Sequence, residues 1–157
     1  MTALMLYHDR YDSTGPLGSA APDVVLLHGW GLHTIVWDPV VPFLLERFCV
    51  TVIDLPGMGR SPLPNATLTP ESVVAQLAAV APENAVWLGW SLGGELALAF
   101  AAKHPERVMG LMLIASNPCF VQTQGWPRAM PAQTFAAFSD FFDEDPEATL
   151  IRFLSLQ

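Results

Sequence analysis

The sequence contains few basic residues and few cysteines. Lysine and arginine together number 7 among 157 residues, and the net charge is −8. Nucleic-acid binding requires clustered basic side chains that neutralise phosphates, so this composition argues against a nucleic-acid partner. Cys49 and Cys119 stand in no metal-binding or redox spacing. We expect both to be reduced thiols in a cytoplasmic protein.

Long apolar runs are also missing. No run reaches the ~18 residues that a membrane-spanning helix needs. The first residues, MTALMLYHDRYD, do not show the basic start and apolar stretch of a signal peptide. These features predict a cytoplasmic location and no membrane partner. The length and the hydrophobic share of 52% are sufficient for the core of one domain.

Apolar strand patterns and helical patterns alternate along residues 1–116. The predicted strands cover residues 23–29, 49–57, 84–90 and 107–116. The predicted helices cover residues 39–48, 70–82 and 92–103, the second with Thr69 as its N-cap. Each predicted strand is apolar on both faces, which is typical of a parallel sheet covered on both sides. We therefore predict an α/β fold with a mainly parallel sheet and helices on both faces.

Residues 117–157 have a different character. An irregular segment over 117–131 is rich in proline and glutamine, and amphipathic helical patterns follow over 132–142 and 147–157. This arrangement predicts a helical excursion from the sheet that covers a ligand site, as a partial cap does. Because the sequence stops inside the last helical pattern without a C-cap signal, we expect a truncated form of a longer protein.

A Gly-x-Ser-x-Gly motif lies between the predicted strand over 84–90 and the helix over 92–103. In a nucleophile elbow, the tight turn holds the serine in a strained conformation that exposes its hydroxyl. Larger side chains at Gly89 and Gly93 would collide with the turn. The amide of Leu92 begins the helix and can donate a hydrogen bond to a developing oxyanion. The motif therefore predicts Ser91 as a nucleophile.

Two further glycine-containing segments follow predicted strands. HGWG, residues 28–31, lies at the carboxyl end of the sheet, where ligands bind in α/β folds. The amide of Trp30 is the expected partner of the Leu92 amide, and a plain tight turn is the alternative. In DLPGMGRSP, residues 54–62, Pro62 occupies the place of a third glycine, which argues against a dinucleotide loop. We expect a structural turn beside the site.

The segments HGWGLHTIVW, DLPGMGRS, LGWSLGG and HPERV, in this order and spacing, resemble the α/β-hydrolase superfamily. SNPCF and the terminal RFLSLQ are similar to an esterase family of biotin synthesis that acts on pimeloyl-[acyl-carrier-protein] methyl esters. The resemblance implies hydrolysis of an acyl methyl ester to the free acid and methanol. It assigns Ser91 as the nucleophile and Trp30 with Leu92 as the oxyanion hole, with no metal and no cofactor.

The resemblance also implies roles for residues in the cap region. The residues expected to line an acyl-chain pocket are Phe153, Leu154, Ser155, Leu156 and Gln157. Arg152 would lie on the cap surface, where such esterases meet the acidic carrier protein. Residues 1–116 would form the N-terminal part of the hydrolase core and 117–157 part of the cap. The complete enzyme would be a monomer.

A base for Ser91 is not evident in the sequence. The superfamily places the acid and then the histidine after the serine. Only His104 follows Ser91, at the far end of a helix about 18 Å long. His28 is expected to hydrogen-bond its own loop, and His33 is a weaker alternative base. The acidic run over 140–145 follows no predicted strand, so we expect a solvated helix end.

Three functional alternatives therefore stay open. The first is a methyl esterase whose triad acid and histidine are absent from these 157 residues, so that the chain itself has little activity. The second is another α/β-hydrolase esterase or lipase with a different acyl group. The third is a catalytically silent hydrolase-like fragment or binding module.

Overall fold

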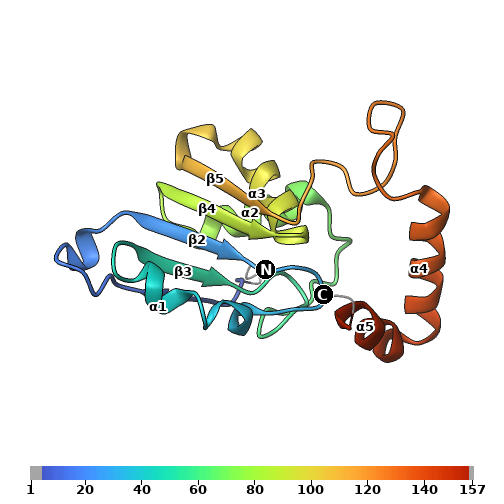
Figure 1. Cartoon of the computed structure of the whole chain (residues 1–157), viewed down its shortest axis with the longest axis horizontal. Helices are drawn as coiled ribbons and strands as arrows, with labels where there is room; N and C mark the ends of the chain where they lie inside the picture. Colours follow the sequence, from blue (N-terminus) through green and yellow to red (C-terminus); the bar gives the residue numbers. More distant parts are fainter. Residues whose placement is uncertain (1–4, 156–157) are drawn as a thin grey trace. The chain divides into compact units, whose positions relative to one another are not determined.

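The computed structural model describes residues 5–155, which form two compact units. The first unit extends to Ser116 and contains the sheet, and the second begins at Asn117 and contains two helices (Figure 1). Within the described residues, no helix is both long enough and apolar enough to cross a membrane.

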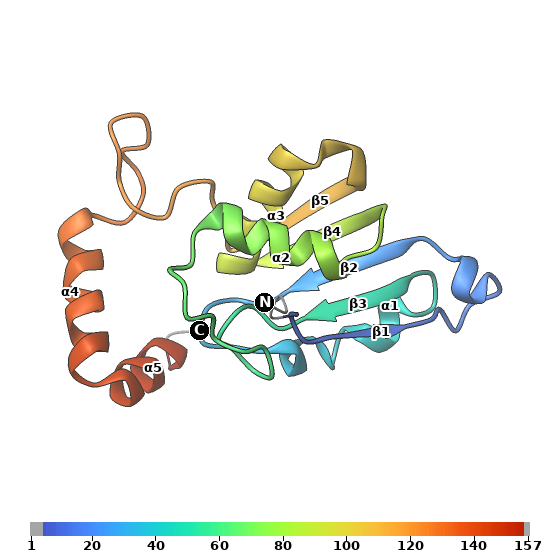
Figure 2. The same ribbon diagram turned by 180° about the vertical axis from the view of Figure 1, so that it is seen from behind.

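The first unit is built on a five-stranded sheet. Its strands are β1 (His8–Tyr11), β2 (Asp23–Leu27), β3 (Cys49–Ile53), β4 (Ala85–Trp90) and β5 (Val108–Ile114). They lie in the order β1-β3-β2-β4-β5, and all neighbours are parallel except β1 and β3 (Figure 2). The mainly parallel α/β fold is therefore confirmed. The antiparallel strand β1 was not predicted, because its sequence HDRY is short and polar.

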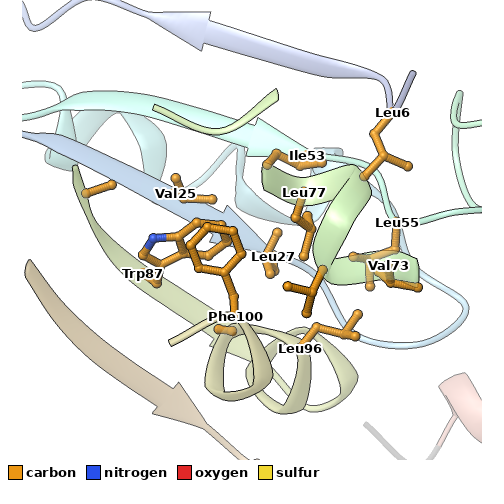
Figure 3. Packing of buried hydrophobic residues seen from close by; sticks show 13 residues of the cluster. Leu6, Val25, Leu27, Ile53, Leu55, Val73, Leu77, Trp87, Leu96 and Phe100 are labelled. Carbon is orange, nitrogen blue, oxygen red and sulfur yellow. The ribbon is translucent and has the colours of Figure 1, made fainter. Parts of the chain in front are cut away.

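Alternate residues of the central strand β2 face two separate hydrophobic clusters, as the two-residue repeat of a strand requires. Val25 and Leu27 belong to one cluster, which also contains residues of α2 (Pro70–Val80) and α3 (Leu92–Lys103). Figure 2 shows these two helices on the face opposite to α1 (Val41–Leu44). Trp87 stacks on Phe100 in this cluster, with ring centroids 4.0 Å apart (Figure 3).

Val24 and Leu26 belong to the cluster on the other face. It includes Trp37, from the 3₁₀ helix Thr34–Trp37, and packs against partly buried residues of α1. The helix predicted over 39–48 is present but shorter, since α1 covers only Val41–Leu44. The amide of Phe43 donates to Val40 and that of Arg47 to Leu44, both in the three-residue spacing of 3₁₀ turns.

The helices on either side of β4 agree with the sequence prediction. Thr69 caps α2, since its side chain accepts a hydrogen bond from the Ser72 amide and the Ser72 side chain accepts one from the Thr69 amide. This reciprocal pair is a capping box and stabilises the helix start. The predicted helix over 92–103 is confirmed at both ends, and it stops at His104 before Pro105.

Strand β5 departs from the prediction that every strand is covered on both faces. It lies at one end of the sheet, and among the described residues it pairs only with β4. Met109 is 64% exposed and Met112 is 55% exposed. The apolar sequence predicted the strand correctly, and a chain of these 157 residues is expected to leave it as an exposed apolar edge, which agrees with its place in the sheet.

The second unit contains the helices α4 (Ala132–Glu144) and α5 (Pro146–Leu154). Asp145 joins them, and its side chain caps α5 by accepting a hydrogen bond from the Ala148 amide. Both helices were predicted, although α5 begins one residue earlier. Leu156 and Gln157, which were assigned to an acyl pocket, lie outside the described residues.

Candidate active site

Ser91 occupies the one-residue turn between β4 and α3. Its backbone has φ 53° and ψ −121°, an uncommon and strained conformation for a residue with a side chain. Serine often caps a helix with its hydroxyl, but the Ser91 side chain makes no capping hydrogen bond. The Ser91 amide donates to the carbonyl of Ile114 at 2.9 Å. The backbone is therefore anchored while the hydroxyl is not used to cap the helix.

The glycines on both sides of Ser91 allow close backbone packing. A Cβ atom on Gly89 would lie 2.4 Å from the Gly93 carbonyl group. One on Gly93 would lie 2.3 Å from the carbonyl oxygen of Leu27, at the end of β2. Real Cβ contacts are essentially never this short. The motif predicted that larger side chains at Gly89 and Gly93 would collide with the turn, and the structure shows this at both positions.

The loop after β2 lies directly beside the elbow. A Cβ atom on Gly29 would lie only 3.4 Å from the Cβ atom of Ser91. Gly31 has φ 73°, a conformation that favours glycine. Trp30 lies between these two glycines, so the structure brings Trp30, Ser91 and Leu92 into one small region at the carboxyl ends of β2 and β4.

The start of α3 contributes to the electrostatics of this region. The N-terminus of a helix carries a partial positive charge, which stabilises nearby negative charge. Glu95 is the acidic residue in the first turn of α3. Burial raises the pKa of its carboxyl above the ordinary value of 4.5. The environment thus disfavours a negative charge on Glu95 beside the helix start.

His28 holds the loop after β2 in place. The Leu55 amide donates to its Nε2 at 2.9 Å. The proton of a neutral ring therefore lies on Nδ1, which donates to the Gly29 carbonyl at 2.8 Å. Burial of the ring lowers the pKa of His28 below the ordinary 6.5 and keeps it neutral. The predicted role of His28, hydrogen bonding within its own loop, is confirmed.

The loop after β2 and the loop after β3 are joined by the hydrogen bond between His28 and Leu55. Asp54 joins them a second time, and the sequence did not predict this role. Its buried carboxylate accepts hydrogen bonds from the Thr34 amide at 2.7 Å and the Arg60 amide at 2.8 Å. A Cβ atom on Gly59, where φ is 55°, would lie 2.3 Å from this carboxylate. The loop over 54–62 is therefore a structural turn, as predicted. The one signal in the sequence that could have indicated this role is an aspartate directly after a buried apolar strand.

Replacing His28 by glutamine is expected to reduce the loss of stability on acidification. Since burial lowers the pKa of His28, the unfolded chain binds a proton that the folded chain does not. This contribution is fully present above about pH 6.5 and is lost as the pH falls toward the folded-state pKa. Between about pH 6.5 and the folded-state pKa of His28, the free energy of unfolding should fall by up to ~1.4 kcal/mol per pH unit more in the wild type than in His28→Gln.

Urea unfolding at several pH values between about 7.5 and about 5.5 measures this difference. The matched control is His104→Gln, the same substitution at the far end of α3 and away from the loop that His28 holds. If the free energy of unfolding depends on pH in the same way in the wild type and in His28→Gln, the role of the buried neutral ring is contradicted.

Neither His104 nor His33 is seen to hydrogen-bond to the Ser91 hydroxyl in the part of the chain that the structure describes. His104 is at the opposite end of the 12-residue helix α3, and its Nδ1 lies 3.6 Å from the carboxylate of Glu106. The described residues show no hydrogen bond between Ser91 and the exposed His33. The acidic run over 140–145 lies at the end of α4 and the start of α5, where Asp145 caps a helix.

The predicted acyl-pocket residues lie in the second unit. Phe153 lines a largely apolar hollow of about 720 Å³ between α4 and α5, together with Phe138, Phe141 and Arg152. The rings of Phe138 and Phe153 have centroids 6.0 Å apart. Leu154 is half-buried but is not among the residues that line this hollow.

Ser155 is exposed, and its hydroxyl donates to the carbonyl of Arg152. Of the described acyl-pocket candidates, the hollow therefore contains Phe153 and not Leu154 or Ser155.

The elbow at Ser91 and the parallel sheet define a class of protein. Residues 22–157 match the family described as alpha/beta hydrolase fold, and the chain belongs to this family. Its sequence is 43% identical over 141 residues to the pimeloyl-[acyl-carrier protein] methyl ester esterase of Klebsiella pneumoniae (strain 342). That match covers 90% of this chain and 54% of the relative.

The esterase of the same name from Salmonella heidelberg (strain SL476) is 46% identical over 134 residues, which cover 85% of this chain and 52% of the relative. The chain thus spans about half the length of the curated relatives it matches.

Solved structures show the same fold. An esterase from Exiguobacterium antarcticum superposes with a TM-score of 0.82 at 25% identity, covering 94% of this chain and 55% of that one. A bromoperoxidase from Bacillus anthracis gives a TM-score of 0.81 at 23% identity, covering 94% and 54%. At that identity the likeness concerns the fold alone.

Proposed function

We propose that this chain carries the nucleophile half of a carboxylesterase active site that hydrolyses an acyl methyl ester. The Ser91 oxygen attacks the ester carbonyl, and the amides of Trp30 and Leu92 bind the resulting oxyanion. A carbon–oxygen bond to Ser91 forms and methanol leaves. Water then attacks the acyl-enzyme, releasing the free acid and restoring the hydroxyl. The observation that carries the proposal is the strained backbone of Ser91, with φ 53°, at the β4–α3 turn.

The proton transfers need a general base. The base accepts the Ser91 proton, gives it to the departing methoxide and later takes a proton from water. We assign this role to a histidine with an acidic partner in the second half of a full-length hydrolase, in the order typical of the superfamily. This assignment agrees with the match of this chain to about half of each curated relative.

The proposed substrate is an acyl group of the pimeloyl type held on an acyl carrier protein, in the cytoplasm. The names of the two relatives state such a substrate, and this supports the proposal. Phe153, in the apolar hollow of the second unit, is proposed to contact the acyl chain. Leu154, Ser155, Leu156 and Gln157 are included as neighbouring candidates. The cationic Arg152 is proposed to face the acidic carrier protein.

A chimera tests the substrate class. This chain is continued after Gln157 by the C-terminal segment of the Klebsiella pneumoniae relative, which supplies the base. Methyl esters of dicarboxylic acids and of monocarboxylic acids with increasing chain length are assayed, free and on acyl carrier protein. The proposal expects the highest kcat/KM for a pimeloyl-length methyl ester on the carrier protein.

Equal rates for short esters without carrier protein would instead indicate an esterase with a different acyl group. Failure of a fluorophosphonate probe to label Ser91 in the folded chimera would support a catalytically silent module. Ser91→Ala is the required negative control, and Ser139→Ala, at an exposed serine of α4, is the matched positive one.

A further inference from the structure

The end of β5 holds the backbone of Ser91 on both sides. The Ile114 carbonyl accepts the Ser91 amide at 2.9 Å. Two residues later, the Ser116 hydroxyl donates to the Ser91 carbonyl oxygen, also at 2.9 Å. Between them, Ala115 has φ 46°, an uncommon conformation for alanine. This turn allows both neighbours of Ala115 to bond to the same residue of the elbow.

The second glycine after Ser91 supports a specific role for Ser116. The Gly-x-Ser-x-Gly motif requires Gly89 and Gly93 but not Gly94. A Cβ atom on Gly94 would lie 2.5 Å from the Ser116 hydroxyl oxygen and 2.6 Å from its Cβ atom. Gly94 therefore leaves the space that Ser116 needs to reach the Ser91 carbonyl.

The geometry of the peptide bond connects Ser116 to the oxyanion hole. The carbonyl of Ser91 and the amide of Leu92 belong to one planar, trans peptide group and point in opposite directions. The amides of Gly94 and Glu95 donate to this carbonyl oxygen at 2.9 Å and 3.2 Å. The hydroxyl of Ser116 adds a donor from outside the helix, so it restricts the rotation of the peptide plane.

Restricting that rotation fixes the direction of the Leu92 amide. Hydrogen bonds to a carbonyl also polarise its peptide group, which makes the N–H a stronger donor. We propose that Ser116 is a positioning residue that orients the Leu92 amide toward the oxyanion through the Ser91 carbonyl. The inference rests on the proposed function, because it takes the Leu92 amide as an oxyanion donor.

The first test is the inactivation, by a fluorophosphonate, of the chimera described above, which supplies the general base. Loss of one hydrogen bond to the positioned peptide should lower the maximal inactivation rate of Ser116→Ala about fivefold to tenfold, with the half-saturating concentration unchanged. Ser116→Thr keeps the hydroxyl and should restore most of the rate. Ser116→Cys, a weak donor of similar size, should behave like Ser116→Ala. An unchanged maximal rate in Ser116→Ala and Ser116→Cys would overturn the inference.

The second test does not depend on reactivity. The Gly94 amide donates to the same Ser91 carbonyl oxygen as Ser116. Its hydrogen exchange should become about tenfold faster in Ser116→Ala and recover in Ser116→Thr, while the amide of Leu77 in α2 is unchanged. Equal acceleration at Leu77 would indicate a general loss of stability, and unchanged exchange at Gly94 would show no positioning; both outcomes overturn the inference. A folded wild-type chimera that resists the probe would contradict the proposed function, and the exchange result would still decide the role of Ser116.

Discussion

A chimera that supplies the general base is expected to hydrolyse a methyl ester about a million-fold faster than the 157-residue chain alone. A serine hydroxyl is a weak nucleophile until a neighbouring base accepts its proton. In this chain the one histidine after Ser91 is His104, which α3 places at its far end. The elbow and the oxyanion donors alone leave only a small residual rate enhancement.

The measurement is steady-state turnover of one methyl ester by the chimera and by the chain at equal concentration. Ser91→Ala in the chimera should reduce turnover to the level of the chain or below. Turnover by the chain within tenfold of the chimera would show that a base lies within these residues and would contradict the assignment.

Gly89→Ala is expected to destabilise the first unit strongly. Its Cβ atom would lie 2.4 Å from the Gly93 carbonyl group and 2.5 Å from the Cα atom of Gly94. These are backbone atoms between the sheet and α3, so rotation of a side chain cannot relieve the collision. Overpacking of this kind costs about 3 kcal/mol, and backbone atoms cannot relax to reduce it. Urea unfolding followed by circular dichroism measures the loss.

Gly110→Ala is the matched control in the same sheet. Its nearest atoms are the methyl groups of Val86 at 3.7 Å, an ordinary contact distance. The free energy of unfolding should therefore change by less than ~1 kcal/mol. Similar stability of the two variants would contradict the close packing of the elbow on its own helix.

Local patterns predicted the elbow because its constraints act within a few residues. The tight turn at Ser91, the requirement for Gly89 and Gly93, and the capping of α2 by Thr69 all follow from neighbours in sequence. The same holds for the end of α3, where Pro105 prevents continuation. In these places the structure confirms both the element and its physical reason.

The features that were missed depend on contacts between distant segments. Asp54 accepts a hydrogen bond from Thr34, 20 residues away, and nothing in the local pattern shows this partner. Ser116 bonds to Ser91 across 25 residues because β5 lies beside β4. Such features become predictable only when the topology is known.

The most direct test of the catalytic geometry is a crystal structure of the chain after prolonged reaction with a fluorophosphonate. We expect a single adduct on the Ser91 oxygen. Its phosphonyl oxygen should lie about 2.7–3.1 Å from the backbone nitrogens of both Trp30 and Leu92. An adduct on another serine, or a Ser91 adduct whose phosphonyl oxygen is bound by neither amide, would contradict it.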